Sequence, residues 1–178
     1  DITLAAGSRR WRDVQGPRDF WAVEWGANGG RRIVAAGPVW PTDADASHRI
    51  GGAGVGSILD RRILADPGDP TGASWTWSGM DLGSIARQVV ALAAPDLPLV
   101  LPEVRAGTRT RTYRGFDLAT AGQRIRELTE VQHGPDVIFE PRLKADRISV
   151  EWVMVSGTEG VPKIRSDQSP IVLDATAP

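Results

Sequence analysis

Two segments of the chain have apolar residues at helical spacing, and together they form an imperfect repeat. The first, WSGMDLGSIARQVVALA, begins at Trp77, and the second, YRGFDLATAGQRIRELT, begins thirty-six residues later at Tyr113. Apolar residues three and four apart predict helices over about 82–94 and 118–131. The repeat matches Trp77 with Tyr113, Gly79 with Gly115, and Asp81 with Asp117. Each copy therefore predicts a strand that ends in an aromatic residue, a glycine turn and a helix.

The aspartate in each copy stands directly before the helical spacing begins. Asp81 and Asp117 could be read as paired carboxylates for acid–base chemistry, but a glycine stands two residues before each of them and a leucine directly after. That setting favours the helix N-cap, where a carboxylate accepts a main-chain hydrogen bond. The second helix is expected to stop just before Gly134, which would take the left-handed conformation that follows a helix end, and Pro135 cannot continue the helix.

Alternating apolar and polar residues predict strands elsewhere. FWAVEW, from Phe20 to Trp25, predicts a first strand, and residues 31–36 predict a second that Gly37 and Pro38 interrupt. Residues 107–115 also alternate. Their threonines share one face of the predicted strand, and Arg109, Arg111 and Tyr113 share the other.

The last clear unit is a hairpin in which Leu143 is expected to pair with Asp146. This register places one wholly apolar set on a single face: Val137, Phe139, Pro141, Ile148, Val150 and Trp152. The opposite face carries Glu140, Arg142, Arg147 and Glu151. Pro141 lacks an amide donor, which indicates an edge strand or a bulge.

These elements predict an α+β chain, mostly antiparallel β, with two helices packed on the sheet. Residues 1–70 are expected to be a β-rich segment, a small barrel or sandwich. Residues 71–178 are expected to hold two strand–helix units and the C-terminal hairpin. The chain starts at Asp1 and ends with IVLDATAP, just after a strand-like run. We expect both ends to be cut from a longer polypeptide.

Composition narrows the possible chemistry. The net charge is −1, so no overall positive field favours nucleic acid, and no apolar run reaches the roughly 20 residues of a membrane helix. Cysteine is absent and only two histidines are present, which argues against thiolate chemistry and histidine-rich metal sites. Seven tryptophans indicate aromatic anchors in a core or a protein interface. We expect no cofactor.

Several residue patterns could be catalytic or ligand-binding sites, but an ordinary structural role explains each of them better. Glu140 and Glu151 could imitate a glycosidase pair, but Arg142 and Arg147 on the same face favour cross-strand ion pairs. Asp43, Asp45 and Ser47, like Asp66 and Asp69, could bind calcium, although such clusters are common in turns. The glycines from Gly51 to Gly56 lack a dinucleotide-binding fingerprint.

The arginine-rich strand leaves two interpretations. Arg109, Arg111 and Arg114 beside Tyr113 could stack nucleic-acid bases, yet arginine and tyrosine are also enriched in protein interfaces. We favour an interface or a solvated strand face over nucleic-acid binding, and we predict no catalytic, cofactor or metal residue. The interface candidates are Arg109, Arg111, Tyr113, Glu140, Arg142, Arg147 and Glu151.

One longer block has a family resemblance. TRTYRGFDLATAGQRIRELTEVQHGPDVIFEPRL, followed by DRISVEWVMVSG, resembles minor tail proteins of long-tailed phages that infect actinobacteria, within the tail-hub or baseplate-hub family. FWAVEW, RRIVAAGPVWP and GGAGVGSILDRRIL resemble the β-barrel segment of that family. The resemblance covers most of residues 20–157.

The resemblance implies a virion structural protein at the phage tail tip, made in the host cytoplasm. Such hubs form a ring, commonly a trimer, that joins the tail tube or distal tail protein to receptor-binding parts. The residues that carry over are architectural: Gly79, Asp81, Gly115 and Asp117 at strand–helix junctions, and Gly134 with Pro135 before the hairpin. The alternatives are a carbohydrate-active or cell-wall-degrading tail enzyme domain and a glycan-binding module.

Overall fold

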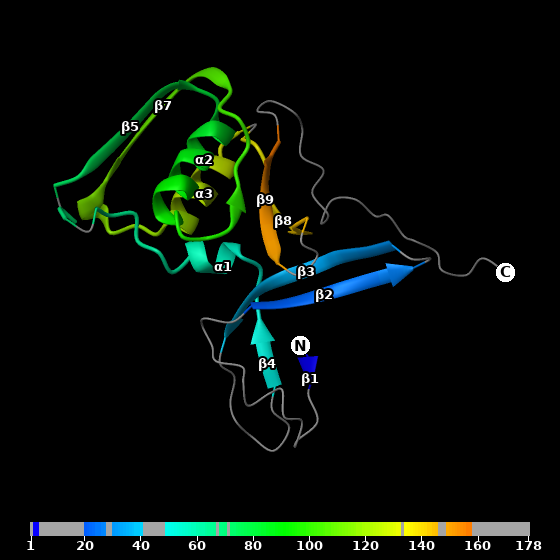
Figure 1. Ribbon diagram of the computed structural model, residues 1–178. Helices are drawn as coiled ribbons and strands as arrows, with labels where there is room; N and C mark the ends of the chain where they lie inside the picture. The colour runs from blue at the N-terminus through cyan, green and yellow to red at the C-terminus, as the bar shows by residue number, and fades with distance from the viewer. Residues whose placement is uncertain are drawn as a thin grey trace.

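The computed structural model describes residues 2–3, 20–27, 30–40, 49–66, 68–70, 72–132, 134–145 and 149–157. These residues form an α+β structure with three α-helices and mostly antiparallel strands (Figure 1). The predicted fold class is confirmed at this level. No described helix is long and apolar enough to cross a membrane.

The N-terminal strands form an open four-stranded sheet. Its order is β1 (Ile2–Thr3), β4 (Arg49–Gly52), β3 (Gly30–Trp40) and β2 (Phe20–Ala27), and all its pairs are antiparallel. The predicted barrel is wrong for the described residues, because β1 and β2 stay at opposite edges of the sheet.

The predicted break at Gly37 and Pro38 is also wrong, because β3 continues through both residues. What changes there is the neighbouring strand. Pro38 is the last residue of β3 that pairs with β2, and the next two residues pair with β4. A proline suits a place where the ladder on one side ends, because it has no amide to donate.

The two copies of the repeat lie next to each other in space. After the short helix α1 (Gly56–Leu59) come β5 (Ser74–Met80), α2 (Leu82–Ala93), β7 (Ala106–Arg114), the 3-10 turn η2 (Gly115–Asp117) and α3 (Ala121–Thr129). β5 pairs antiparallel with β7, with Trp75 opposite Tyr113. We call this pair the ribbon. The helices α2 and α3 contact each other beside it (Figure 1).

A third sheet closes the fold, in the order β6 (Leu99–Val100), β9 (Val150–Ser156), β8 (Val137–Leu143). β8 is antiparallel to β9 and lies at the edge, as Pro141 predicted. The predicted register is wrong by four residues, since Leu143 pairs with Val150 and the amide of Lys144 donates to the carbonyl of Ser149 (2.9 Å). A shift of four residues keeps each side chain on its predicted face.

The buried residues form two clusters. The larger one holds the apolar faces of α2 and α3, together with Leu59, Leu64, Tyr113 and Met154. The smaller one joins Ile33 and Ala36 of β3 to Val55 and to Trp152 of β9. Trp152 therefore packs the third sheet against the N-terminal sheet.

Candidate functional site

The inner face of the ribbon belongs to the core. Tyr113, predicted as an interface residue, is only 4% exposed. Its ring lies 5.8 Å from that of Trp77, and the guanidinium carbon of Arg124 lies 5.1 Å from its centre. The prediction of Tyr113 as an interface residue is therefore wrong, because its side chain packs against the helices and is not available to a partner.

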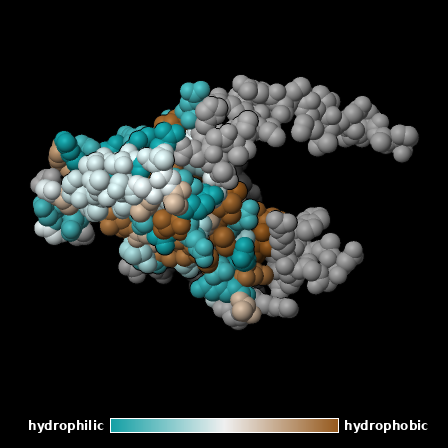
Figure 2. All heavy atoms as spheres, turned by 90° about the horizontal axis from the view of Figure 1, so that it is seen from above, coloured by the Kyte–Doolittle hydropathy of each residue, from teal (hydrophilic) through white to brown (hydrophobic). Residues whose placement is uncertain are grey.

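The outer face of the ribbon carries exposed hydroxyl groups. Thr76 pairs with Thr112 and Ser78 with Thr110, and the hydroxyl oxygens of Thr76 and Thr112 lie 2.9 Å apart. Figure 2 shows this region as a long pale surface of intermediate hydropathy. Arg111 is partly buried, and its Nη1 donates to the carbonyl of Thr110 (3.0 Å). Its guanidinium is thus held against its own strand.

The outer face of the third sheet contains three of the four predicted charged candidates. Glu140 and Arg142 are exposed and Glu151 is partly buried, whereas Arg147 lies outside the described residues. Arg142 is the register partner of Glu151, but no ion pair joins these two side chains. The expected cross-strand ion pair is therefore wrong for Arg142 and Glu151, and neither charge is neutralised by the other.

The same face is apolar at its other end, a feature that was not among the residues predicted from the sequence. Ile138 (50% exposed) and Val155 (38%) are register partners, and Val100 pairs with Val153 on the neighbouring strands. We name the whole surface the outer sheet face. It consists of Val100, Ile138, Glu140, Arg142, Glu151, Val153 and Val155.

At the first strand–helix junction, the predicted cap is confirmed. Asp81 is the N-cap of α2, and its Oδ1 accepts a hydrogen bond from the amide of Ser84 (2.7 Å). Its Oδ2 forms an ion pair with Nε of Arg105 (2.9 Å), whose Nη2 donates to the hydroxyl of Ser156 (2.7 Å). One aspartate thus ties the helix start, through an arginine, to the end of β9.

At the second junction, the predicted cap is wrong. Thr120 is the N-cap of α3, and its hydroxyl accepts from the amide of Gln123 (3.1 Å). Leu118 turns the chain with φ 50°, so the helix starts three residues later than the repeat predicts. Asp117 instead accepts a hydrogen bond from Arg124 Nη2 (2.7 Å). It fixes the arginine that covers Tyr113.

The glycines of the two junctions are needed for different reasons. Gly79 has φ 69° with no atom near its missing Cβ, whereas a Cβ on Gly115 would lie 2.6 Å from the carbonyl oxygen of Pro70. We expect Gly79→Ala to cost about 1–2 kcal/mol through backbone strain. We expect Gly115→Ala to cost about 1–3 kcal/mol through overpacking. Chemical denaturation measures both. Unchanged stability in either variant would contradict the corresponding geometry.

Gly134 and Pro135 are both buried before β8. The predicted left-handed conformation of Gly134 is wrong, since its φ is not positive. A Cβ there would lie 2.6 Å from the carbonyl oxygen of Leu128 and 2.9 Å from that of Thr129. Glycine is required because the chain passes close to the end of α3.

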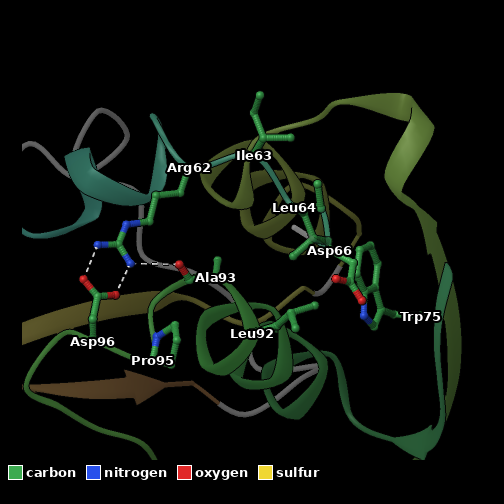
Figure 3. Close-up of a pocket in the computed structure, with 10 residues that line it drawn as sticks. Arg62, Ile63, Leu64, Asp66, Trp75, Leu92, Ala93, Pro95 and Asp96 are labelled. Atoms are coloured by element: carbon green, nitrogen blue, oxygen red, sulfur yellow. Dashed lines mark hydrogen bonds and ion pairs between the residues drawn. The ribbon is translucent and has the colours of Figure 1, made fainter. Parts of the chain in front are cut away.

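A pocket of about 550 Å³ lies between residues 62–66 and the C-terminal end of α2 (Figure 3). At one end, Nη1 and Nη2 of Arg62 both donate to the carboxylate of Asp96, and Nη1 also donates to the carbonyl of Ala93 (2.9 Å). The hydrogen bond from Arg62 lowers the pKa of Asp96. The ion pair of Arg62 and Asp96 therefore closes one end of the pocket, and its two charges are already paired.

The opposite end of the pocket holds Asp66 and Trp75, as Figure 3 shows. Between the two ends lie apolar side chains, of which Ile63 and Leu92 are substantially exposed. The sequence around Asp66 predicts only a turn or a calcium ligand. Among the described residues, no group of three or more His, Cys, Asp or Glu side chains could hold a metal ion.

Comparison with known proteins gives no relative. No family model, no curated protein and no solved structure matches the chain. Its function must therefore be argued from the surfaces described above.

Proposed function

We propose that this chain is a structural subunit of a phage tail tip, a minor tail or hub protein that assembles through its outer sheet face. Its partners would be further copies of itself, the tail tube or distal tail protein, and receptor-binding parts. The proposal joins the sequence resemblance to one structural observation: an exposed apolar sheet surface with charged residues at one end.

That surface has the composition of a protein interface. Exposed apolar side chains that lie together, bordered by polar residues, are characteristic of surfaces that a partner covers. Ile138, Val155 and Val100 supply the apolar part. Arg142 and Glu151 supply one charge of each sign, and they are not paired with each other. Charges at the edge of such a surface orient a partner more than they strengthen binding.

Two experiments test this function. Antibodies raised against the chain should label the tail tips of virions of the phage that encodes it, as seen by immunogold electron microscopy. A phage carrying Val155→Glu should assemble complete tails about tenfold less often or worse, because a carboxylate would be buried in the apolar contact.

The matched control is Thr112→Glu, the same new side chain at an exposed strand position on the ribbon. Both variants should keep the wild-type melting temperature, and Thr112→Glu should leave tail assembly unchanged. Virions without label would overturn the tail function. Labelled virions with normal assembly of Val155→Glu would overturn only the choice of surface.

A further inference from the structure

The pocket between residues 62–66 and the end of α2 is lined by exposed apolar side chains that a ligand could contact. Ile63 is 49% exposed and Leu92 is 39% exposed, although both are aliphatic and line the same concavity. The volume of about 550 Å³ falls within the ~300–1,000 Å³ usual for ligand sites. Such a pocket can bury more than one side chain of an occupant.

The charge of the pocket selects for a cation. It is lined by one arginine and two aspartates, and Arg62 already neutralises Asp96. The Oδ1 of Asp66 accepts one hydrogen bond, from the amide of Gly68 (2.8 Å), and Asp66 forms no ion pair within the described part of the chain. Arg62 also binds the carbonyl end of α2, at Ala93 (2.9 Å), so the carboxylate of Asp66 is the unbalanced charge of the pocket.

The aromatic ring of Trp75 favours a cation that is carried on an aliphatic stem. Trp75 lines the pocket at the same end as Asp66 (Figure 3). The aliphatic stem of a lysine or arginine can lie along an indole ring while its charged group reaches a carboxylate. The remaining apolar surface, between Ile63 and Leu92, then suits an aliphatic or aromatic neighbour of that basic residue.

We propose that this pocket binds a segment of a partner protein in which an apolar side chain stands next to a lysine or arginine. The basic group would pair with Asp66 over Trp75, and the apolar side chain would lie between Ile63 and Leu92. The inference does not depend on the phage assignment, because it uses none of the residues of the outer sheet face.

The chain offers a closely matched pair of variants for the test. Asp66 and Asp69 each accept one main-chain hydrogen bond in the same segment, Asp69 from the amide of Gly72 (2.9 Å), but only Asp66 lines the pocket. Asp66→Asn and Asp69→Asn should therefore have the same small effect on stability. Only the first should change ligand binding.

The probes are short fluorescein-labelled peptides with leucine or tryptophan beside arginine, titrated into the full chain by fluorescence anisotropy. We expect Asp66→Asn to weaken binding about tenfold or more and Asp69→Asn to leave it within about twofold. Replacing the peptide arginine with glutamate should abolish binding. Leu92→Ser should weaken the same peptides while leaving their salt dependence unchanged.

Three results would overturn the proposal. The first is equal binding by Asp66→Asn and Asp69→Asn. The second is no saturable binding of any basic–apolar peptide by a folded chain. The third is binding of a simple alkylamine as tight as that of the peptides, since that would indicate a small-molecule site instead of a protein-binding one.

Discussion

Trp152→Ala should lower the free energy of unfolding by about 3–5 kcal/mol, the range for deleting a fully buried large aromatic side chain. Trp152 is 2% exposed and occupies the centre of the smaller buried cluster. Its ring lies 5.1 Å from that of Phe20, and its indole nitrogen donates to the carbonyl of Ala36 (3.4 Å). Deleting it therefore leaves a cavity between the third sheet and the N-terminal sheet.

Urea denaturation followed by far-ultraviolet circular dichroism measures this loss. Val155→Ala is the matched control, because Val155 lies on the same strand with its side chain on the outer face. It should cost less than about 1 kcal/mol. Trp152→Phe should fall between the two, since it keeps an aromatic ring but gives up the hydrogen bond. Similar losses in the two alanine variants would show that Trp152 does not join the sheets.

The sequence was most informative about which side chains share a face. Val137, Phe139 and Pro141 were expected on the same sheet face as Trp152, and they remain on that face although the register is wrong by four residues. Alternation fixes the face but leaves the register to the turn and to tertiary packing. The predicted two-residue turn, Lys144-Ala145, has neither the glycine nor the asparagine that tight hairpin turns prefer. The longer connection instead places Met154 opposite Phe139.

The repeat predicted the N-cap of α2 correctly but not that of α3. Asp81 caps α2 as expected, but the second copy offers two possible caps, Asp117 and Thr120. The repeat alignment favoured the first. The structure uses the second, because Arg124 on α3 binds Asp117 and Leu118 adopts a left-handed turn. A contact between a turn and the following helix has no signature in the aligned residues.

The surfaces were the least predictable part. Ile138 and Val155 lie on the outer sheet face within runs of apolar residues, 137–139 and 153–155, in which alternation does not separate the two faces. The pocket depends on Arg62 and Asp96, which are thirty-four residues apart in the chain. No local pattern brings them together. The proposed basic–apolar binding site follows only from the way that segment 62–66 packs against the end of α2.

The chain should lose stability as the pH rises from about 10 to about 12, because of Tyr113. Burial of its ring raises the pKa of Tyr113 to about 12, with a smaller contribution from the charge of Glu127. In the unfolded chain the phenol would ionise near its ordinary pKa of about 10. A group whose pKa is raised by folding stabilises the fold fully below the unfolded pKa, and that contribution disappears as the pH passes the folded pKa.

A shift of two pKa units corresponds to about 2–3 kcal/mol. Tyr113→Phe keeps the buried ring and removes the ionisable group, so the free energy of unfolding of the variant should fall less over this pH range. Because Tyr113 is the one tyrosine of the chain, ultraviolet titration of the native protein reports its ionisation directly. Ionisation near pH 10 in the folded protein, or parallel losses in wild type and Tyr113→Phe, would show that the phenol is not buried against α2 and α3.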